Sequence, residues 1–254
     1  IIDSDNQQKI IKRIIKTLNL DEKYYPAKEL QWYINDKKDD GLRAKHVQVG
    51  YSQQEKQHLQ VYQAYESACQ LAGLVDFAEL LLRAHELLLN HPPLLAHYQQ
   101  RFRHVLVDEF QDTNTIQYAW VRLLAGQQGN VFIVGDDDQS IYGWRGAKIE
   151  NIHQFSHDFP GTHTIKLEQN YRSSGTILSA ANALISHNAD RLGKELWTAD
   201  DEGEPIRLYA AFNETDEARY VIDRIRDWVE QGNARKETAI LYRSNAQSRV
   251  FEEN

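Results

Sequence analysis

Two short apolar runs, each of strand length and each leading into acidic residues, most constrain how this chain can fold. They are His104–Asp108 (HVLVD) and Val131–Gly135 (VFIVG), and the second is followed by Asp136–Asp138. Between them, residues 115–125 carry apolar side chains at helical spacing. Two apolar strands separated by a helix are typical of a βαβ unit in a parallel sheet. The sequence therefore predicts an α/β fold for this region.

The segments on either side differ in pattern. Before residue 101 the chain shows helical spacing, with a capping box at Ser4 and Gln7 and a second N-cap at Asp76. We expect helices there over residues 4–18, 27–37, 53–71 and 77–90. After residue 160 we expect strands at 164–167, 206–210 and 238–242 and helices at 174–186 and 214–230. A largely helical region is thus predicted to precede α/β structure.

Composition excludes several classes of protein. Hydrophobic residues make up 41% and charged residues 26%, as in globular proteins. With 29 Lys+Arg against 37 Asp+Glu the net charge is −8, so any DNA binding would come from a local groove rather than from overall charge. No apolar stretch reaches the roughly 18–20 residues of a membrane helix, so we expect no membrane partner. The single cysteine, Cys69, fits a reducing compartment.

Asp108 and Glu109 end the first predicted strand. A carboxylate at the carboxyl end of a parallel strand lies where α/β sheets bind ligands, and there Asp108 can bind Mg²⁺. The adjacent Glu109 can orient or deprotonate an attacking water. The structural alternative is that both carboxylates only favour the start of a helix through its dipole.

The loop after the second strand carries an amide and two aromatic rings. Gln139 can donate to a phosphate oxygen and accept from a water, whereas Asp136–Asp138 is either a metal cluster or a solvated turn. Tyr142 and Trp144 are flanked by glycines and Arg145, a setting that favours exposed rings over core packing. Stacking a nucleic-acid base on such a ring is worth about 1–3 kcal/mol.

Four segments in order resemble motifs of superfamily 1 DNA helicases of the UvrD/Rep/PcrA type. They are VDEFQDTN (107–114), GDDDQSIYGWRGA (135–147), LEQNYRS (167–173) and YRSNAQSRV (242–250), and the segment 73–90 resembles the UvrD branch. The resemblance implies parts of two RecA-like P-loop NTPase domains preceded by a mostly helical inserted subdomain. It divides the chain into a helical insertion at 1–100, the C-terminal part of the first RecA-like domain at 101–167 and the N-terminal part of the second at 168–254.

The resemblance also implies roles at a nucleotide site. Asp108 would bind Mg²⁺, and Glu109 would act as the catalytic base. Gln139 would sense the γ-phosphate of ATP, and Arg172 would stabilise charge on it from across the interdomain cleft. Tyr171 would stack on adenine.

For DNA, the resemblance implies that Tyr142 and Trp144 stack on single-stranded bases and that Arg145 links the DNA loop to the nucleotide site. Further DNA contacts are expected from Phe77, Asn245 and Arg249. The implied activity is ATP-dependent 3′–5′ translocation on single-stranded DNA and unwinding at duplex junctions, with ATP and Mg²⁺ as cofactors. DNA-repair proteins are the implied partners, and the bacterial cytoplasm and nucleoid the implied location.

The phosphate-binding Walker A loop has no counterpart in the sequence. It requires Gly, four residues and Gly-Lys-Ser/Thr, but the only Gly-Lys pair, Gly193-Lys194, is followed by Glu195. Because the sequence also contains no Met, we expect an internal fragment of a longer protein that is inactive alone. Two alternatives stay open: a non-catalytic DNA- or partner-binding fragment, and a metal-dependent nuclease using Asp108, Glu109 and Asp136–Asp138.

Overall fold

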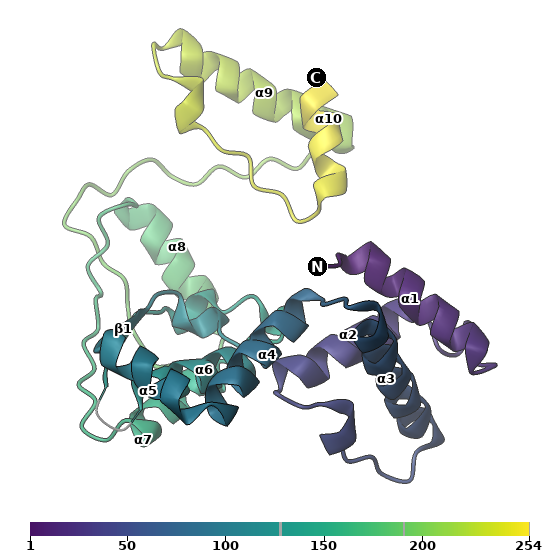
Figure 1. The fold of residues 1–254 in the computed structure, drawn as a ribbon. Coiled ribbons are helices and arrows are strands. Elements are labelled where there is room, and N and C mark those ends of the chain that lie inside the picture. Colours follow the sequence, from purple (N-terminus) through teal and green to yellow (C-terminus); the bar gives the residue numbers. More distant parts are fainter. Residues whose placement is uncertain (127–128, 190, 254) are drawn as a thin grey trace. The chain divides into compact units, whose positions relative to one another are not determined.

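The computed structural model describes residues 1–126, 129–189 and 191–253. The chain divides into two compact units (Figure 1). Unit 1 comprises Ile1–Lys166 and Asn188–Gly193, and unit 2 comprises Leu167–His187 and Lys194–Asn254. The chain therefore enters unit 2 after Lys166, returns to unit 1 for a few residues and then enters unit 2 again.

The N-terminal part of unit 1 is helical, as predicted. Its helices are α1 (Ser4–Thr17), α2 (Ala27–Asp39), α3 (Gln53–Ala72), α4 (Phe77–Asn90) and α5 (Pro92–Arg101). The cap of α1 differs from the prediction, because Asp3 rather than Ser4 accepts the N-terminal hydrogen bond, from Asn6 N at 2.8 Å. Nowhere in the part of the chain that the structure describes is a helix long and apolar enough to cross a membrane.

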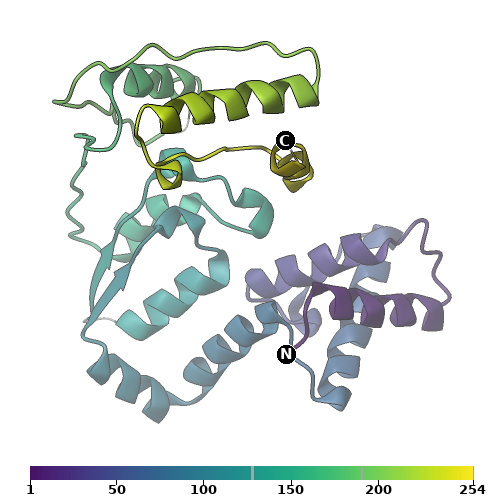
Figure 2. The same cartoon turned by 90° about the horizontal axis from the view of Figure 1, so that it is seen from above.

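Helices α1, α2 and α3 pack together around a shared core (Figure 2). Its fully buried side chains come from one stripe of each helix: Ile11, Ile15, Leu30, Ile34, Val61, Tyr62 and Tyr65. Gly73 ends α3 in the left-handed region at φ 64°, which costs glycine little. Helix α5 was not predicted. Pro92 and Pro93 follow the end of α4 at Asn90 and occupy the first turn of α5, where their missing N–H groups lose no helical hydrogen bond.

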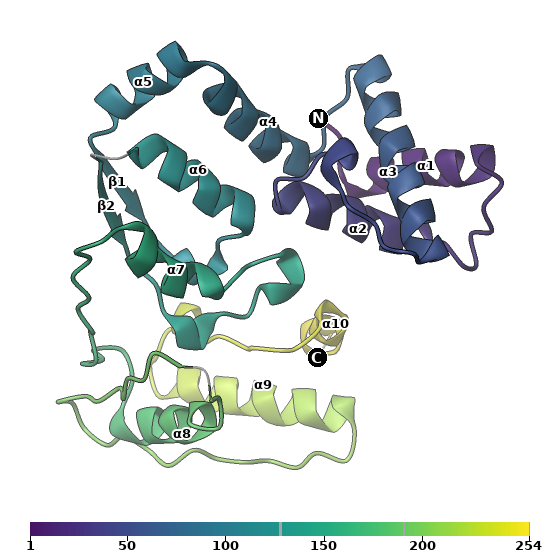
Figure 3. The same ribbon diagram turned by 90° about the horizontal axis from the view of Figure 1, so that it is seen from below.

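The predicted βαβ unit is confirmed. Strands β1 (His104–Val107) and β2 (Asn130–Ile133) pair in parallel, and α6 (Thr115–Ala125) connects them (Figure 3). Asn114 begins α6 with a reciprocal capping box to Gln117. The mixture of helices with a small parallel sheet is the fold class that the sequence predicts at this coarse level.

The sheet is covered on one face. Val107 and Val131 pack against Phe110, Tyr118 and Phe155. Phe155 belongs to α7 (Glu150–Asp158), a helix that the apolar pattern did not reveal. The alternate residues of both strands are exposed, because the described residues provide no second layer over them.

Unit 2 contains α8 (Gly175–Ile185), α9 (Glu214–Glu230) and α10 (Ser248–Glu253). Helices α8 and α9 were predicted within one residue at each end. The strands predicted at 164–167, 206–210 and 238–242 are wrong for this structure, where these residues form no ladder. An isolated extended segment leaves its N–H and C=O groups unpaired, and none of the three finds a partner strand among the described residues. Their apolar side chains, such as Leu208 and Leu241, are consequently exposed.

Candidate functional site

The carboxyl ends of β1 and β2 are joined by backbone hydrogen bonds. Val134 N donates to Val107 O at 2.8 Å, and Phe110 N donates back to Val134 O at 2.9 Å. Between these bonds lies Glu109, whose φ of 49° is in the left-handed region. That conformation costs a residue with a Cβ about 1–2 kcal/mol, so the surrounding contacts hold a sharp turn at this glutamate.

Gln111 connects the two strand ends. Its buried side chain donates from Nε2 to Glu109 Oε2 at 2.8 Å and accepts on Oε1 from Asp136 N at 3.0 Å. The approach requires Gly135, because a Cβ there would lie 2.8 Å from Gln111 Oε1. Sequence reasoning missed Gln111. The only signal was an uncharged polar residue two positions after the acidic pair.

Gln139 is brought to the same edge of the sheet by Asp136. Asp136 begins the short helical turn Asp137–Gln139, with Oδ1 accepting from Asp138 N at 3.0 Å. Its other oxygen, Oδ2, accepts from Gln139 Nε2 at 2.7 Å. Hydrogen bonds therefore link Glu109, Gln111, Asp136 and Gln139. Asp108, directly before Glu109, is exposed and accepts on Oδ1 from Glu109 N at 2.9 Å.

The carboxylates of Asp136–Asp138 lie within 4.8 Å of one another. Two of them are engaged by a nearby segment. Asp137 Oδ2 accepts from Leu192 N at 2.7 Å, and Asp138 forms a two-pronged ion pair with Arg191, in which both N–O distances are 2.7 Å. These contacts favour the turn over the metal cluster, because the guanidinium already supplies the positive charge that a metal would bring.

The aromatic residues of the next loop form a small cation–π group. The guanidinium of Arg145 lies 4.7 Å from the ring centre of Tyr142 and 4.6 Å from that of Trp144. Trp144 is 75% exposed, whereas Tyr142 is partly buried. The expected exposed ring is thus present at Trp144, with a positive charge beside it, which suits a stacked base and its phosphate.

The other predicted nucleotide residues belong to unit 2. Asn170 Oδ1 accepts from Arg172 N at 2.9 Å and from Ser173 N at 2.8 Å, fixing the turn before α8. Tyr171 is exposed and donates its hydroxyl to Gln169 Oε1 at 2.9 Å. Tyr171 and Arg172 therefore sit together on one turn, with side chains accessible to a ligand.

The remaining residues predicted to contact DNA lie on different elements. Phe77 is exposed at the first residue of α4 in unit 1. Asn245 and Arg249 are exposed in unit 2. Asn245 begins the short helical turn Asn245–Gln247 directly before α10, and Arg249 lies in α10, where its Nε donates to Glu253 Oε1 at 2.6 Å. Within the part of the chain that the structure describes, no hydrogen bond or ion pair joins Phe77 to the loop of Trp144.

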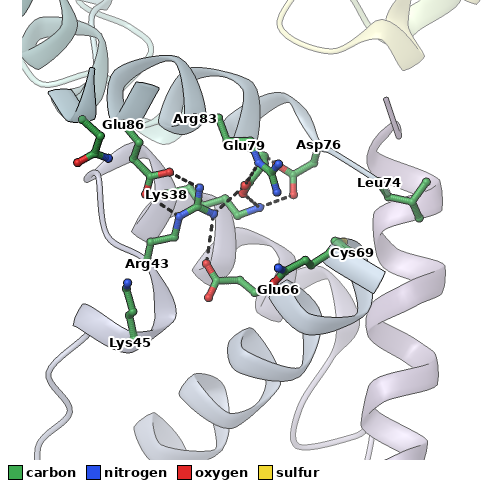
Figure 4. A pocket seen from close by; sticks show the side chains of 12 residues that line it. Lys38, Arg43, Lys45, Glu66, Cys69, Leu74, Asp76, Glu79, Arg83 and Glu86 are labelled. Atoms are coloured by element: carbon green, nitrogen blue, oxygen red, sulfur yellow. Dashed lines mark hydrogen bonds and ion pairs between the residues drawn. The ribbon is translucent and has the colours of Figure 1, made fainter. Parts of the chain in front are cut away.

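A pocket of about 430 Å³ lies elsewhere in unit 1, in the helical part (Figure 4). Lys38 there bonds Asp76 at 2.7 Å and Glu79 at 2.9 Å. Arg43 bonds Glu79 at 2.7 Å and Glu86 at 2.6 Å. Burial by itself raises the pKa of Glu79, but the surrounding hydrogen bonds and positive charges outweigh it and lower that pKa to about 2. These ion pairs join α2 and the connection that follows it to α4, so we assign the cluster to the fold rather than to the predicted site.

The sequence matches two family models that together span nearly the whole chain. Residues 1–160 match the UvrD/REP helicase N-terminal domain, and residues 165–254 match the UvrD-like helicase C-terminal domain. The chain therefore belongs to the UvrD/REP helicase family, as the four motifs predicted.

Individual relatives agree with this assignment. Over 253 residues the chain is 64% identical to DNA helicase II of Escherichia coli (strain K12) and 57% identical to DNA helicase II of Haemophilus influenzae. It is 43% identical over 256 residues to the ATP-dependent DNA helicase PcrA of Leuconostoc citreum. Each match covers all of this chain but only 34–35% of the relative, so the chain spans about a third of the length of these proteins.

Proposed function

We propose that this chain is part of an ATP-dependent DNA helicase that moves 3′ to 5′ along single-stranded DNA and unwinds duplex at a junction, in DNA repair. The observation that carries the proposal is the hydrogen-bonded link from Glu109 through Gln111 and Asp136 to Gln139. It unites two of the family motifs at the carboxyl edge of a parallel sheet, the edge at which α/β proteins bind nucleotides.

The proposal divides the chain as the resemblance does. Residues 1–100 form part of the helical insertion, 101–167 part of the first RecA-like domain and 168–254 part of the second. The βαβ unit and α7 support the assignment of the middle segment. In the last segment, support comes from the turn of Tyr171 and Arg172 directly before a helix.

The residues at the sheet edge suit Mg²⁺ and ATP. Asp108 is an exposed hard-oxygen ligand at a strand end, and its second oxygen has no hydrogen bond in the described residues. Bound Mg²⁺ neutralises charge on the phosphates. Gln111 holds the Glu109 carboxylate by one oxygen and leaves the other to accept a proton from water. Gln139, held by Asp136, offers its amide to the terminal phosphate, while Arg172 supplies positive charge as the phosphoryl group departs.

Phosphate release from ATP tests the proposal, measured with Mg²⁺ in the presence and absence of single-stranded DNA. We expect DNA-stimulated release from the whole protein that carries this chain. The 254-residue chain alone should release none, because it has no Walker A loop to grip the phosphates. DNA-stimulated turnover by the chain alone would contradict that expectation. DNA binding without any hydrolysis by the whole protein would favour the non-catalytic alternative.

Replacing Trp144 by alanine should weaken single-stranded DNA binding by about 1–3 kcal/mol, the worth of one stacked base. Nucleotide affinity should stay within about twofold, because Trp144 makes no hydrogen bond to the linked residues at the sheet edge. Fluorescence anisotropy of a labelled oligonucleotide measures the first quantity, and titration with a nucleotide analogue the second. Trp120→Ala serves as the control, since this partly exposed tryptophan lies on α6. Equal DNA affinity of wild type and Trp144→Ala would remove Trp144 from the DNA site.

A further inference from the structure

The segment Arg191–Gly193, which we call the strap, ends a stretch, Asn188–Gly193, that belongs to unit 1. The chain before Asn188 and after Gly193 belongs to unit 2. Lys166 is the last residue of unit 1 before the chain enters unit 2. Its side chain binds the backbone of the strap. Its Nζ donates to Leu192 O at 2.9 Å and to Gly193 O at 2.5 Å. Hydrogen bonds therefore join the two places at which the chain passes from unit 1 to unit 2.

The strap also holds the turn that carries Gln139. Leu192 N donates to Asp137, and Arg191 grips both carboxylate oxygens of Asp138. The third aspartate, Asp136, caps the same turn and holds the amide of Gln139. Of the three consecutive aspartates, Asp137 and Asp138 thus bind the strap, and Asp136 holds Gln139.

The pair of Arg191 and Asp138 is suited to fixing a geometry. Its side chains are only 18% and 14% exposed, so water screens the pair less than it screens a surface ion pair. Two parallel charge-assisted hydrogen bonds also fix orientation, which a single lysine contact would not. A shift of the strap would therefore displace Asp138 and, with it, the turn that ends at Gln139.

We propose that Arg191 is a positioning residue for Gln139, and that the strap transmits displacement of unit 2 to the nucleotide site through Asp138. The inference rests on the proposed function, because it takes Gln139 as the group that meets the terminal phosphate. It follows from chain connectivity, since His187 and Lys194 of unit 2 flank the stretch Asn188–Gly193 that contains the strap. It also gives the acidic run 136–138 a role that the motif resemblance left unassigned.

Steady-state ATP hydrolysis by the whole protein at saturating single-stranded DNA tests this role. Arg191→Gln and Asp138→Asn should each lower kcat about tenfold, or ~1.4 kcal/mol in activation free energy, with KM for ATP within about twofold. The double variant should be no slower than the slower single variant, because both changes remove the same interaction. Arg226→Gln is the control, since Arg226 pairs with Asp223 on the surface of α9, and its kcat should match wild type.

Any of three results would overturn the proposal. The losses in kcat of the two single variants could multiply in the double variant, or kcat of Arg191→Gln could stay unchanged. A rise in KM could also account for the whole effect. Hydrogen exchange distinguishes failure of the role proposed for the strap from failure of the proposed function. If the wild-type protein hydrolyses no ATP, the proposed function fails, yet Arg191→Gln should still accelerate amide exchange in residues 136–140 several-fold without affecting α9. Unchanged exchange there would overturn the role of the strap by itself.

Discussion

Glu109→Gln should lower the DNA-stimulated kcat of the whole protein by about 10²–10⁴-fold, the contribution typical of a general base. Glutamine has nearly the same shape as glutamate but does not accept a proton from water at neutral pH. Its amide oxygen still accepts the hydrogen bond that Gln111 Nε2 now gives to Glu109. The change therefore removes the group that accepts the proton but keeps the hydrogen bond through which Gln111 connects the strand ends. ATP affinity should stay within about threefold of wild type.

The measurement pairs phosphate release with equilibrium binding of ATP. Glu150→Gln is a matched control, because Glu150 is exposed at the start of α7 and makes no hydrogen bond to the linked residues of the sheet edge. Its kcat should equal that of wild type. Turnover by Glu109→Gln within about tenfold of wild type would exclude Glu109 as the base. Loss of ATP binding together with turnover would instead indicate that Glu109 organises the site.

Local patterns in the sequence predicted the βαβ unit because each part of it is specified locally. Asn114 and Gln117 cap α6, and apolar runs of strand length flank it. The acidic and amide residues of the site follow from the same pattern, since parallel strands bring their carboxyl ends to one edge. Such features need no knowledge of distant contacts.

The contacts that complete the site depend on tertiary structure, and sequence patterns did not reveal them. In the sequence, Gln111 does not differ from other polar residues. Its role is visible only in the fold, where β2 places Asp136 N within hydrogen-bonding distance of it. The pairing of Arg191 with Asp138 spans 53 residues. The strands expected after residue 160 do not form for the complementary reason, because an apolar run forms a strand only where a partner strand is available.

Lys38→Met should reduce the stability of the helical part of unit 1 by about 3–5 kcal/mol, the cost of leaving a buried charge without its partner. Lys38 is 2% exposed and bonds two buried carboxylates, those of Asp76 and Glu79. Asp76 also caps α4 and accepts a hydrogen bond from Tyr65 at 2.7 Å, and it is only 4% exposed, so water solvates its charge poorly. Urea unfolding at pH 7, followed by circular dichroism, measures the loss.

The neighbouring lysine provides the control. Lys37 pairs with Asp36, which is largely exposed, and Lys37→Met should cost only about 0–1 kcal/mol. The pKa of Glu79 is lowered from 4.5 to about 2, so its ionisation stabilises the wild-type fold above pH 4.5, and that stability is lost as the pH falls from 4.5 towards 2. Without Lys38 the pKa of Glu79 in the folded protein rises, so the loss on acidification should still begin near pH 4.5 but should be smaller and complete at a higher pH. Equal costs for the two lysine variants would mean that the buried ion pairs contribute no more to the fold than a surface pair does.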